Sequence, residues 1–192
     1  MSFPILTILA LLPLIGGAIV LGVKGRSGRA TGLVISIVTA VLGVIAFIAA
    51  ANGTDVSENY HWIKAIGAWY ALSSDGLGMT LVLMTVVLVP VVLLAEWNIG
   101  EKEPSDGTQT WGANVFSGLA LMTEGLAIYC FTAVDVLFFY LIFEASLVPM
   151  YFLISGWGGA RRRRAAIKFL IYSLAGGLVM LFGVIGVGVH GN

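Results

Sequence analysis

The chain has 192 residues, of which 59% are hydrophobic and only 10% charged, and its formal net charge at pH 7 is zero. An ordinary soluble domain has about 25% charged residues. With a mean hydropathy of +1.00, the composition therefore indicates an integral membrane protein and gives no reason to expect a nucleic-acid partner. The single cysteine, Cys130, excludes an intrachain disulfide and lies in an apolar run, where packing explains it.

Long apolar segments recur along the chain. A hydrocarbon core about 30 Å thick requires about 20 mostly apolar residues per helix, and lipid tolerates only helices or closed barrels because backbone groups must be paired. The runs are continuously apolar and do not alternate, which excludes a barrel. We predict an all-α, polytopic transmembrane helix bundle of about six spans, at approximately Phe3–Gly22, Ala30–Ala50, Leu77–Ala95, Gly112–Ala133, Val136–Ile154 and Ala165–Val189.

The orientation follows from the basic residues of the short loops. The first span follows an N-terminus that lacks the basic leader and cleavage site of a signal peptide, so we expect a retained helix. The first loop holds Lys24, Arg26 and Arg29, and the fifth holds the run 161–164 of four arginines. Strict alternation places both loops on the cytoplasmic side. The third loop, on the same side, is acidic with only Lys102, but acidic residues contribute little to the rule. We therefore expect the N-terminus outside.

The second loop, at residues 51–76, is the long outer connection. Its aromatic residues are expected at the level of the lipid headgroups, and they are Tyr60, Trp62, Trp69 and Tyr70. His61, among them, is interpreted as an exposed interfacial histidine.

Two acidic residues lie deep within predicted spans. Glu144 is near the middle of the fifth span, where an acidic side chain costs about 3 kcal/mol on insertion scales. Pro149 cannot donate to the carbonyl of Ala145, and the free carbonyl offers a place for water beside Glu144. Ionisable residues inside membranes are functional by default, so a proton site is favoured over a structural glutamate that is protonated and bonded to a neighbouring helix.

Glu124 occupies the middle of the fourth span, and the next residue, Gly125, would let another helix come close. A proton site and a helix–helix hydrogen bond are equally good interpretations of Glu124. If it lies near Glu144, the two carboxyl groups would titrate as a unit.

The remaining charges have simpler explanations. Lys168 is one turn into the sixth span, where it can extend to the interface, and it shares a helix face with Tyr172. The arginine run is interpreted as a topology determinant with lipid-headgroup contact, and Asp135 as the N-cap of the fifth span. We find no cysteine or histidine cluster for a metal, iron–sulfur or haem site, and no flavin or nicotinamide fingerprint. We therefore expect no cofactor in this chain.

The fifth and sixth spans together carry a long sequence motif. The fifth span reads F-E-x-x-L-x-P-M, a W-G loop follows, and the sixth span opens A-A-I-K-F-x-x-Y before a pair of glycines. Residues 121–183, which contain this motif, resemble the antiporter-like membrane subunits of respiratory complex I, and the M-type subunits most closely. A loop with Trp62 and Asp75 extends the resemblance upstream. The matching residues of the motif are Phe143, Glu144, Leu147, Pro149, Met150, Trp157, Gly158, Lys168 and Tyr172.

The resemblance implies a non-redox subunit of a proton-translocating NADH–quinone oxidoreductase in the bacterial inner membrane. Its partners would be the other membrane-arm subunits and the lipid bilayer, and its transported ion the proton. Glu144, Glu124 and Lys168 match the proton-relay positions of the family on the fifth, fourth and sixth helices. In the family, the counterpart of Glu144 pairs with a lysine on a broken seventh helix.

Family members have roughly fourteen helices arranged around two inverted repeats. The resemblance therefore implies a partial chain, the N-terminal portion of a larger subunit. It divides into 1–111, with three N-terminal helices and their loops, and 112–192, with the first three helices of the first repeat. Two other functions agree with the same residues: a subunit of a multi-subunit cation/proton antiporter, and a membrane-arm scaffold without conduction.

Overall fold

The structure is a computed structural model that describes residues 4–23, 26–63, 68–97 and 111–190, with side chains for all of these except 26 and 187–190. Lys24 and Lys102, two of the basic residues used to predict the orientation, lie outside these ranges. The helices are α1 (Ile5–Gly22), α2 (Arg26–Ala51), α3 (Gly76–Ala95), α4 (Ala113–Thr132), α5 (Val136–Trp157) and α6 (Arg162–His190), and the strands are β1 (Glu58–Ile63) and β2 (Ala68–Leu72).

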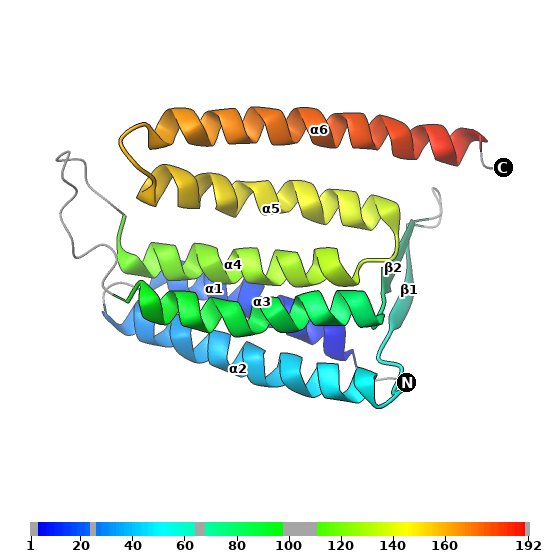
Figure 1. Ribbon diagram of the computed structural model, residues 1–192, viewed down its shortest axis with the longest axis horizontal. Coiled ribbons are helices and arrows are strands. Elements are labelled where there is room, and N and C mark those ends of the chain that lie inside the picture. Colours follow the sequence, from blue (N-terminus) through cyan, green and yellow to red (C-terminus); the bar gives the residue numbers. More distant parts are fainter. Residues whose placement is uncertain (1–3, 24–25, 64–67, 98–110, 191–192) are drawn as a thin grey trace.

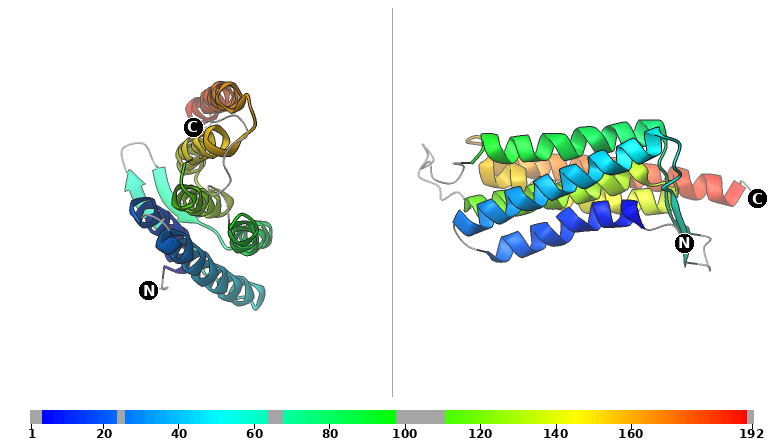
Figure 2. Two further views of the ribbon diagram at one scale, coloured as in Figure 1. Left: turned by 90° about the vertical axis from the view of Figure 1, so that its left-hand side faces the viewer. Right: turned by 90° about the horizontal axis from the view of Figure 1, so that it is seen from below.

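Within the described ranges, six helices are long and apolar enough to cross a membrane, which confirms the predicted all-α transmembrane bundle. Figure 1 shows them side by side along one axis, with the two strands at one end and the α5–α6 turn at the other. In the end-on view of Figure 2, α4 lies in the middle, while α5 and α6 follow one another outward. Accordingly, α4 packs against α1, α2, α3 and α5, whereas α6 packs against α5.

The most extensive contact between two described helices joins α1 and α4. A Cβ atom at Gly17 would lie 2.6 Å from the carbonyl oxygen of Gly118, and one at Gly118 would lie 2.9 Å from that of Gly17. Gly125 meets the carbonyl oxygen of Ala10 in the same way, at 2.5 Å. Since apolar lipid supplies no hydrophobic drive between helices, small residues that let two backbones touch are what hold such a pair together. The predicted close approach at Gly125 is thus confirmed.

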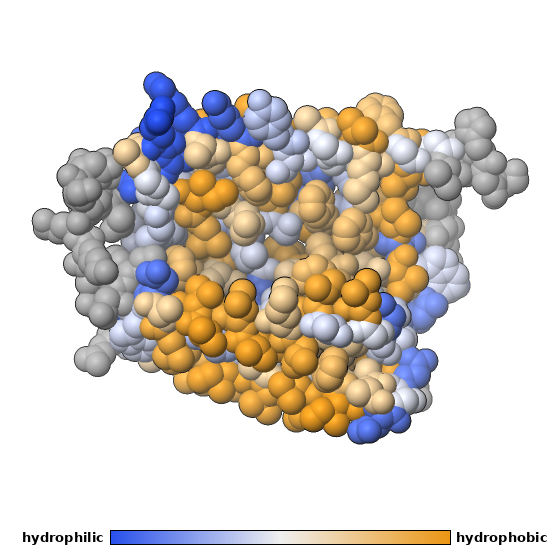
Figure 3. Space-filling view, in the orientation of Figure 1, coloured by the Kyte–Doolittle hydropathy of each residue, from blue (hydrophilic) through white to orange (hydrophobic). Residues whose placement is uncertain are grey.

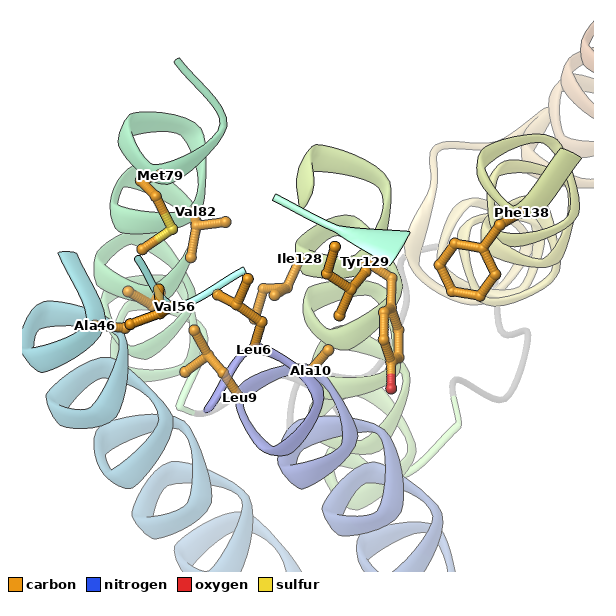
Figure 4. Packing of buried hydrophobic residues seen from close by; sticks show 12 residues of the cluster. Leu6, Leu9, Ala10, Ala46, Val56, Met79, Val82, Ile128, Tyr129 and Phe138 are labelled. Carbon is orange, nitrogen blue, oxygen red and sulfur yellow. The ribbon is translucent and has the colours of Figure 1, made fainter. Parts of the chain in front are cut away.

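Buried apolar side chains cluster near the strand end of the bundle. Figure 4 shows Leu6, Leu9 and Ile128 from α1 and α4 meeting Met79 and Val82 of α3. These side chains are at most 1% exposed. The cluster joins the first four helices, while Phe138 extends it to the start of α5.

The second loop, predicted only as an outer connection with interfacial aromatics, forms an antiparallel β-hairpin. Tyr60 pairs with Tyr70, and His61 with Trp69. Tyr60, Trp62 and Trp69 are exposed, as is His61, in agreement with an interfacial position.

Glu58, at the first position of β1, is buried and only 2% exposed. Its Oε1 accepts hydrogen bonds from the backbone N–H groups of Leu6 at 2.7 Å and Thr7 at 3.1 Å, and its Oε2 accepts one from the Thr7 hydroxyl. The Thr7 hydroxyl also lies 2.6 Å from the hydroxyl of Tyr70. The hairpin therefore supplies the missing cap for the first N–H groups of α1, whose own N-cap residue is Pro4 and makes no side-chain cap.

A second acid joins the hairpin to α5. Asp135 caps α5 by accepting from the N–H of Phe138 at 2.9 Å, as predicted, and its other oxygen accepts from the N–H of Trp69 at 3.2 Å. The backbone of β2 bonds to the α4–α5 connection, since the N–H of Val134 donates to the carbonyl of Ala71 at 2.9 Å.

Replacing Gly17 by Ala should force α1 and α4 apart and lower the free energy of unfolding by about 1–3 kcal/mol, because the added methyl group meets backbone atoms that cannot move aside. The measurement is thermal unfolding of the purified protein in detergent. Gly22→Ala is the matched control on the same helix, because its Cβ would have no described atom within 4 Å. Equal melting temperatures of the two variants would contradict the packing argument.

Glu58→Ala should destabilise the fold by about 1–2 kcal/mol, the usual cost of losing an N-cap, because the N–H groups of Leu6 and Thr7 at the start of α1 lose their acceptor. Thermal unfolding of this variant is compared with that of Glu96→Ala, which removes an exposed carboxylate after the end of α3. If both variants melt like the unchanged protein, Glu58 does not anchor α1.

Candidate functional site

Glu144 lies in the ninth position of the 22-residue helix α5, near mid-helix, as the sequence predicts. Its carboxyl group points at α6, because a Cβ atom built on Gly177 would collide with its Oε1. The ring of Tyr140, one turn earlier on α5, lies 3.6 Å from the same point. A side chain at position 177 would require this carboxyl group to move. Gly177 is therefore part of the Glu144 site.

Oε1 of Glu144 is buried and has no hydrogen-bond partner among the described residues. A buried polar atom without a partner costs about 1–3 kcal/mol, and more when charged. This oxygen therefore requires a partner, which can be a water molecule, a proton or a group of another chain. Pro149 is buried on the same helix, which continues through it as α-helix to Trp157.

Glu124, in the twelfth position of the 20-residue helix α4, is 1% exposed, and neither of its carboxyl oxygens has a hydrogen-bond partner within the described part of the chain. It lines a cavity of about 250 Å³ between α3, α4 and Leu153 of α5. Apart from Glu124, the lining includes two hydroxyl groups, of Thr85 and Thr123, and both donate to carbonyls of their own helices. The expected alternative, a helix–helix hydrogen bond, is not formed within these ranges.

Lys168 is exposed on α6. It precedes Gly177 by nine residues, which corresponds to about 13 Å along the axis and about half a turn around it. Lys168 and the exposed Tyr172 therefore share the face of α6 that looks away from Glu144.

The three predicted relay residues thus occupy three separate places. Glu144 lies between α5 and α6, Glu124 beside a cavity bounded by α3 and α5, and Lys168 on the outer face of α6. The two carboxyl groups do not bond to one another, since both Glu124 oxygens and Oε1 of Glu144 are unpartnered in the described structure. Sequence reasoning missed Gly177 and Tyr140. The sequence marks the position by the consecutive glycines Gly176 and Gly177. Only the contact between α5 and α6 tells which of the two faces Glu144.

The part of the chain around Glu144 matches a known family. A family model described as "NADH:quinone oxidoreductase/Mrp antiporter, TM" matches residues 133–191. The chain is 38% identical to NADH-quinone oxidoreductase subunit M of Mycobacterium tuberculosis, over 96% of this chain and 38% of that relative. It is 32% identical to F(420)H(2) dehydrogenase subunit M of Methanosarcina mazei, over 95% of this chain and 36% of the relative.

A solved structure, respiratory complex I from Thermus thermophilus with bound NADH, contains a chain that superposes with a TM-score of 0.80 at 29% identity. The match covers 96% of this chain and 36% of that one. The chain is homologous to antiporter-like membrane subunits of complex I. The predicted resemblance is therefore confirmed, including its M-type character. The chain described here spans 38% of the length of the Mycobacterium subunit.

Gly177→Ala should displace the Glu144 carboxyl group, whereas Gly176→Ala, one residue earlier, should not, because a Cβ there has no described atom within 4 Å. The measurement is the rate at which a hydrophobic carbodiimide labels Glu144, followed by mass spectrometry. We expect a several-fold change of rate in the first variant only. The same rate in both variants would show that Glu144 does not pack against Gly177.

Proposed function

We propose that this chain contributes a proton-translocating part of the membrane arm of an NADH–quinone oxidoreductase. The observation that supports it best is the buried, unpartnered oxygen of Glu144 at mid-helix, within the segment that matches the family model. Homology to subunits M of an NADH-quinone oxidoreductase and of an F(420)H(2) dehydrogenase supports the same proposal. Electron transfer would occur on other subunits, so this chain would need no redox cofactor.

In this proposal Glu144 takes up and releases a proton. A carboxyl group in lipid is strongly destabilised when charged, so its protonation state responds to any cation or water that approaches it. A partner that docks beside α5 and α6 and brings a positive charge would favour the ionised form. Withdrawal of that charge would favour proton uptake.

Glu124 and Lys168 would be further relay positions. Glu124 is separated from Glu144 by the body of α5, so a proton passing between them would need water, for which the 250 Å³ cavity beside Glu124 offers space. Lys168 faces away from Glu144 and would exchange protons with a group that lies against the outer face of α6. All three positions fall in the range 112–192, the proposed proton-translocating core.

The proposal includes an orientation. The N-terminus of α1 and the β-hairpin would face the outside of the bacterial inner membrane, and the arginine run between α5 and α6 the cytoplasm. Neighbouring membrane-arm subunits and lipid would cover the exposed apolar surface of α6, on which Val179 and Phe182 are 73% and 76% exposed.

Glu144→Gln in the intact enzyme should lower the rate of proton translocation by about 100-fold, because an amide cannot exchange a proton, while the complex still assembles. Proton translocation is measured with a pH-sensitive dye in reconstituted vesicles, and assembly by native gel. Glu96→Gln, the same change at an exposed site, is the control and should translocate normally.

Three outcomes of this experiment separate the functions. Lost translocation with normal assembly supports a proton site at Glu144. Normal translocation overturns it. Lost assembly together with a lower melting temperature, and no separate effect on translocation, identifies the chain as a structural scaffold.

A further inference from the structure

The end of the molecule opposite the hairpin carries two adjoining hollows. The first has a volume of about 240 Å³ and lies between α5, the start of α6 and Trp111. Its polar lining comes from Tyr151, Ser155, Arg162 and Arg163. Figure 3 shows hydrophilic residues gathered at this end, over the α5–α6 turn, directly beside apolar surface.

The second hollow has a volume of about 440 Å³ and is apolar. It lies between α4 and α5 and is lined by Val115, Leu119 and the backbone of Gly112, together with Trp111 and Phe152. The last two residues also line the first hollow, and the centroids of their rings are 5.8 Å apart. A basic chamber and an apolar channel therefore meet at one aromatic pair.

This combination is specific for one class of ligand. Arginine guanidinium groups hold phosphate oxygens with paired, charge-assisted hydrogen bonds, and basic pockets between membrane helices bind anionic headgroups. Arg162 is also the first residue of α6, where the helix dipole favours negative charge. The apolar channel is lined by residues of α4 and α5, two helices long and apolar enough to span the membrane, and offers an acyl chain an apolar surface. A tryptophan at the junction is the residue type typical of the lipid–water interface.

The arginine run divides into two pairs. Arg162, which is half-buried, and Arg163, which is exposed, line the basic chamber. Arg161 and Arg164 are absent from the linings of the two hollows in the described structure. A topology signal requires only the number of charges in the loop. The placement of one pair in a chamber that shares Trp111 and Phe152 with an apolar channel goes beyond that requirement.

We propose that Arg162 and Arg163 bind the phosphate of an anionic phospholipid of the bilayer, with one acyl chain in the channel between α4 and α5. The site is independent of proton transfer at Glu144, since it uses none of the relay residues. The bound lipid would fix the α5–α6 turn against α4.

The test uses the intact complex, delipidated in detergent and titrated with phosphatidylglycerol or with phosphatidylcholine of the same chains. Bound lipid is counted by native mass spectrometry. Arg162→Gln with Arg163→Gln should weaken phosphatidylglycerol binding by about 5-fold for each arginine removed and leave phosphatidylcholine unaffected. The matched control is Arg161→Gln with Arg164→Gln, which removes the same charge from the same turn.

Equal losses in the two double variants would show that the arginines act only through overall surface charge, and would overturn the site. The acyl channel is tested separately by Phe152→Ala, which should weaken phosphatidylglycerol binding but not the retention of inorganic phosphate. If inorganic phosphate displaces the lipid completely and Phe152→Ala has no effect, the chamber is an anion site and the lipid proposal is wrong. Proton translocation is measured on the same samples. A failure of the proton-site proposal at Glu144 is therefore distinguishable from a failure of the lipid-site proposal.

Discussion

The backbone contact between α1 and α4 is the interaction on which the rest of the bundle depends. Lipid does not drive apolar helices together, so close packing must supply the attraction. Where Gly17 meets Gly118 and Gly125 meets Ala10, carbonyl oxygens of one helix occupy the space that a Cβ atom on the glycine of the other would need. This contact places α4 in the middle of the bundle, and α3 and α5 then pack on its remaining sides. As a result, Glu124 is removed from lipid and faces a cavity.

The hairpin performs the second structural task, at the end of the bundle opposite the α5–α6 turn. Glu58 caps α1 across 52 residues of sequence, and Asp135 both caps α5 and binds β2. These acids lie at helix ends, where free N–H groups satisfy a carboxylate. Glu124 and Glu144 lie in mid-helix, where all backbone N–H groups are already paired. The same kind of side chain is therefore a structural anchor at a helix end and a group with unpartnered oxygens in mid-helix.

The two mid-helix acids also differ from one another. Glu124 is enclosed by helices on three sides, whereas Glu144 lies at the contact between α5 and α6, the outermost pair of the bundle. Access to Glu144 is therefore controlled by whatever packs on these two helices. Glu124 faces a cavity lined by α3, α4 and α5 of this chain. The proposed lipid, at the far end of the same helices, would act on a different part of the α5–α6 unit.

By itself the sequence determined the membrane class, the spans, the cap at Asp135, the close approach at Gly125 and the depth of Glu124 and Glu144. Each of these follows from local pattern, because span length, cap chemistry and position within a helix need no knowledge of neighbours. The tertiary structure decided which face of each helix meets a partner. It paired Glu144 with Gly177 instead of Gly176, turned Lys168 away from Glu144, and folded the second loop into a hairpin that holds α1 through Glu58. The sequence of α6 is apolar on nearly all faces, so it does not specify which face packs on α5. The second loop lacks a clear alternating pattern, so its sequence does not predict the two strands.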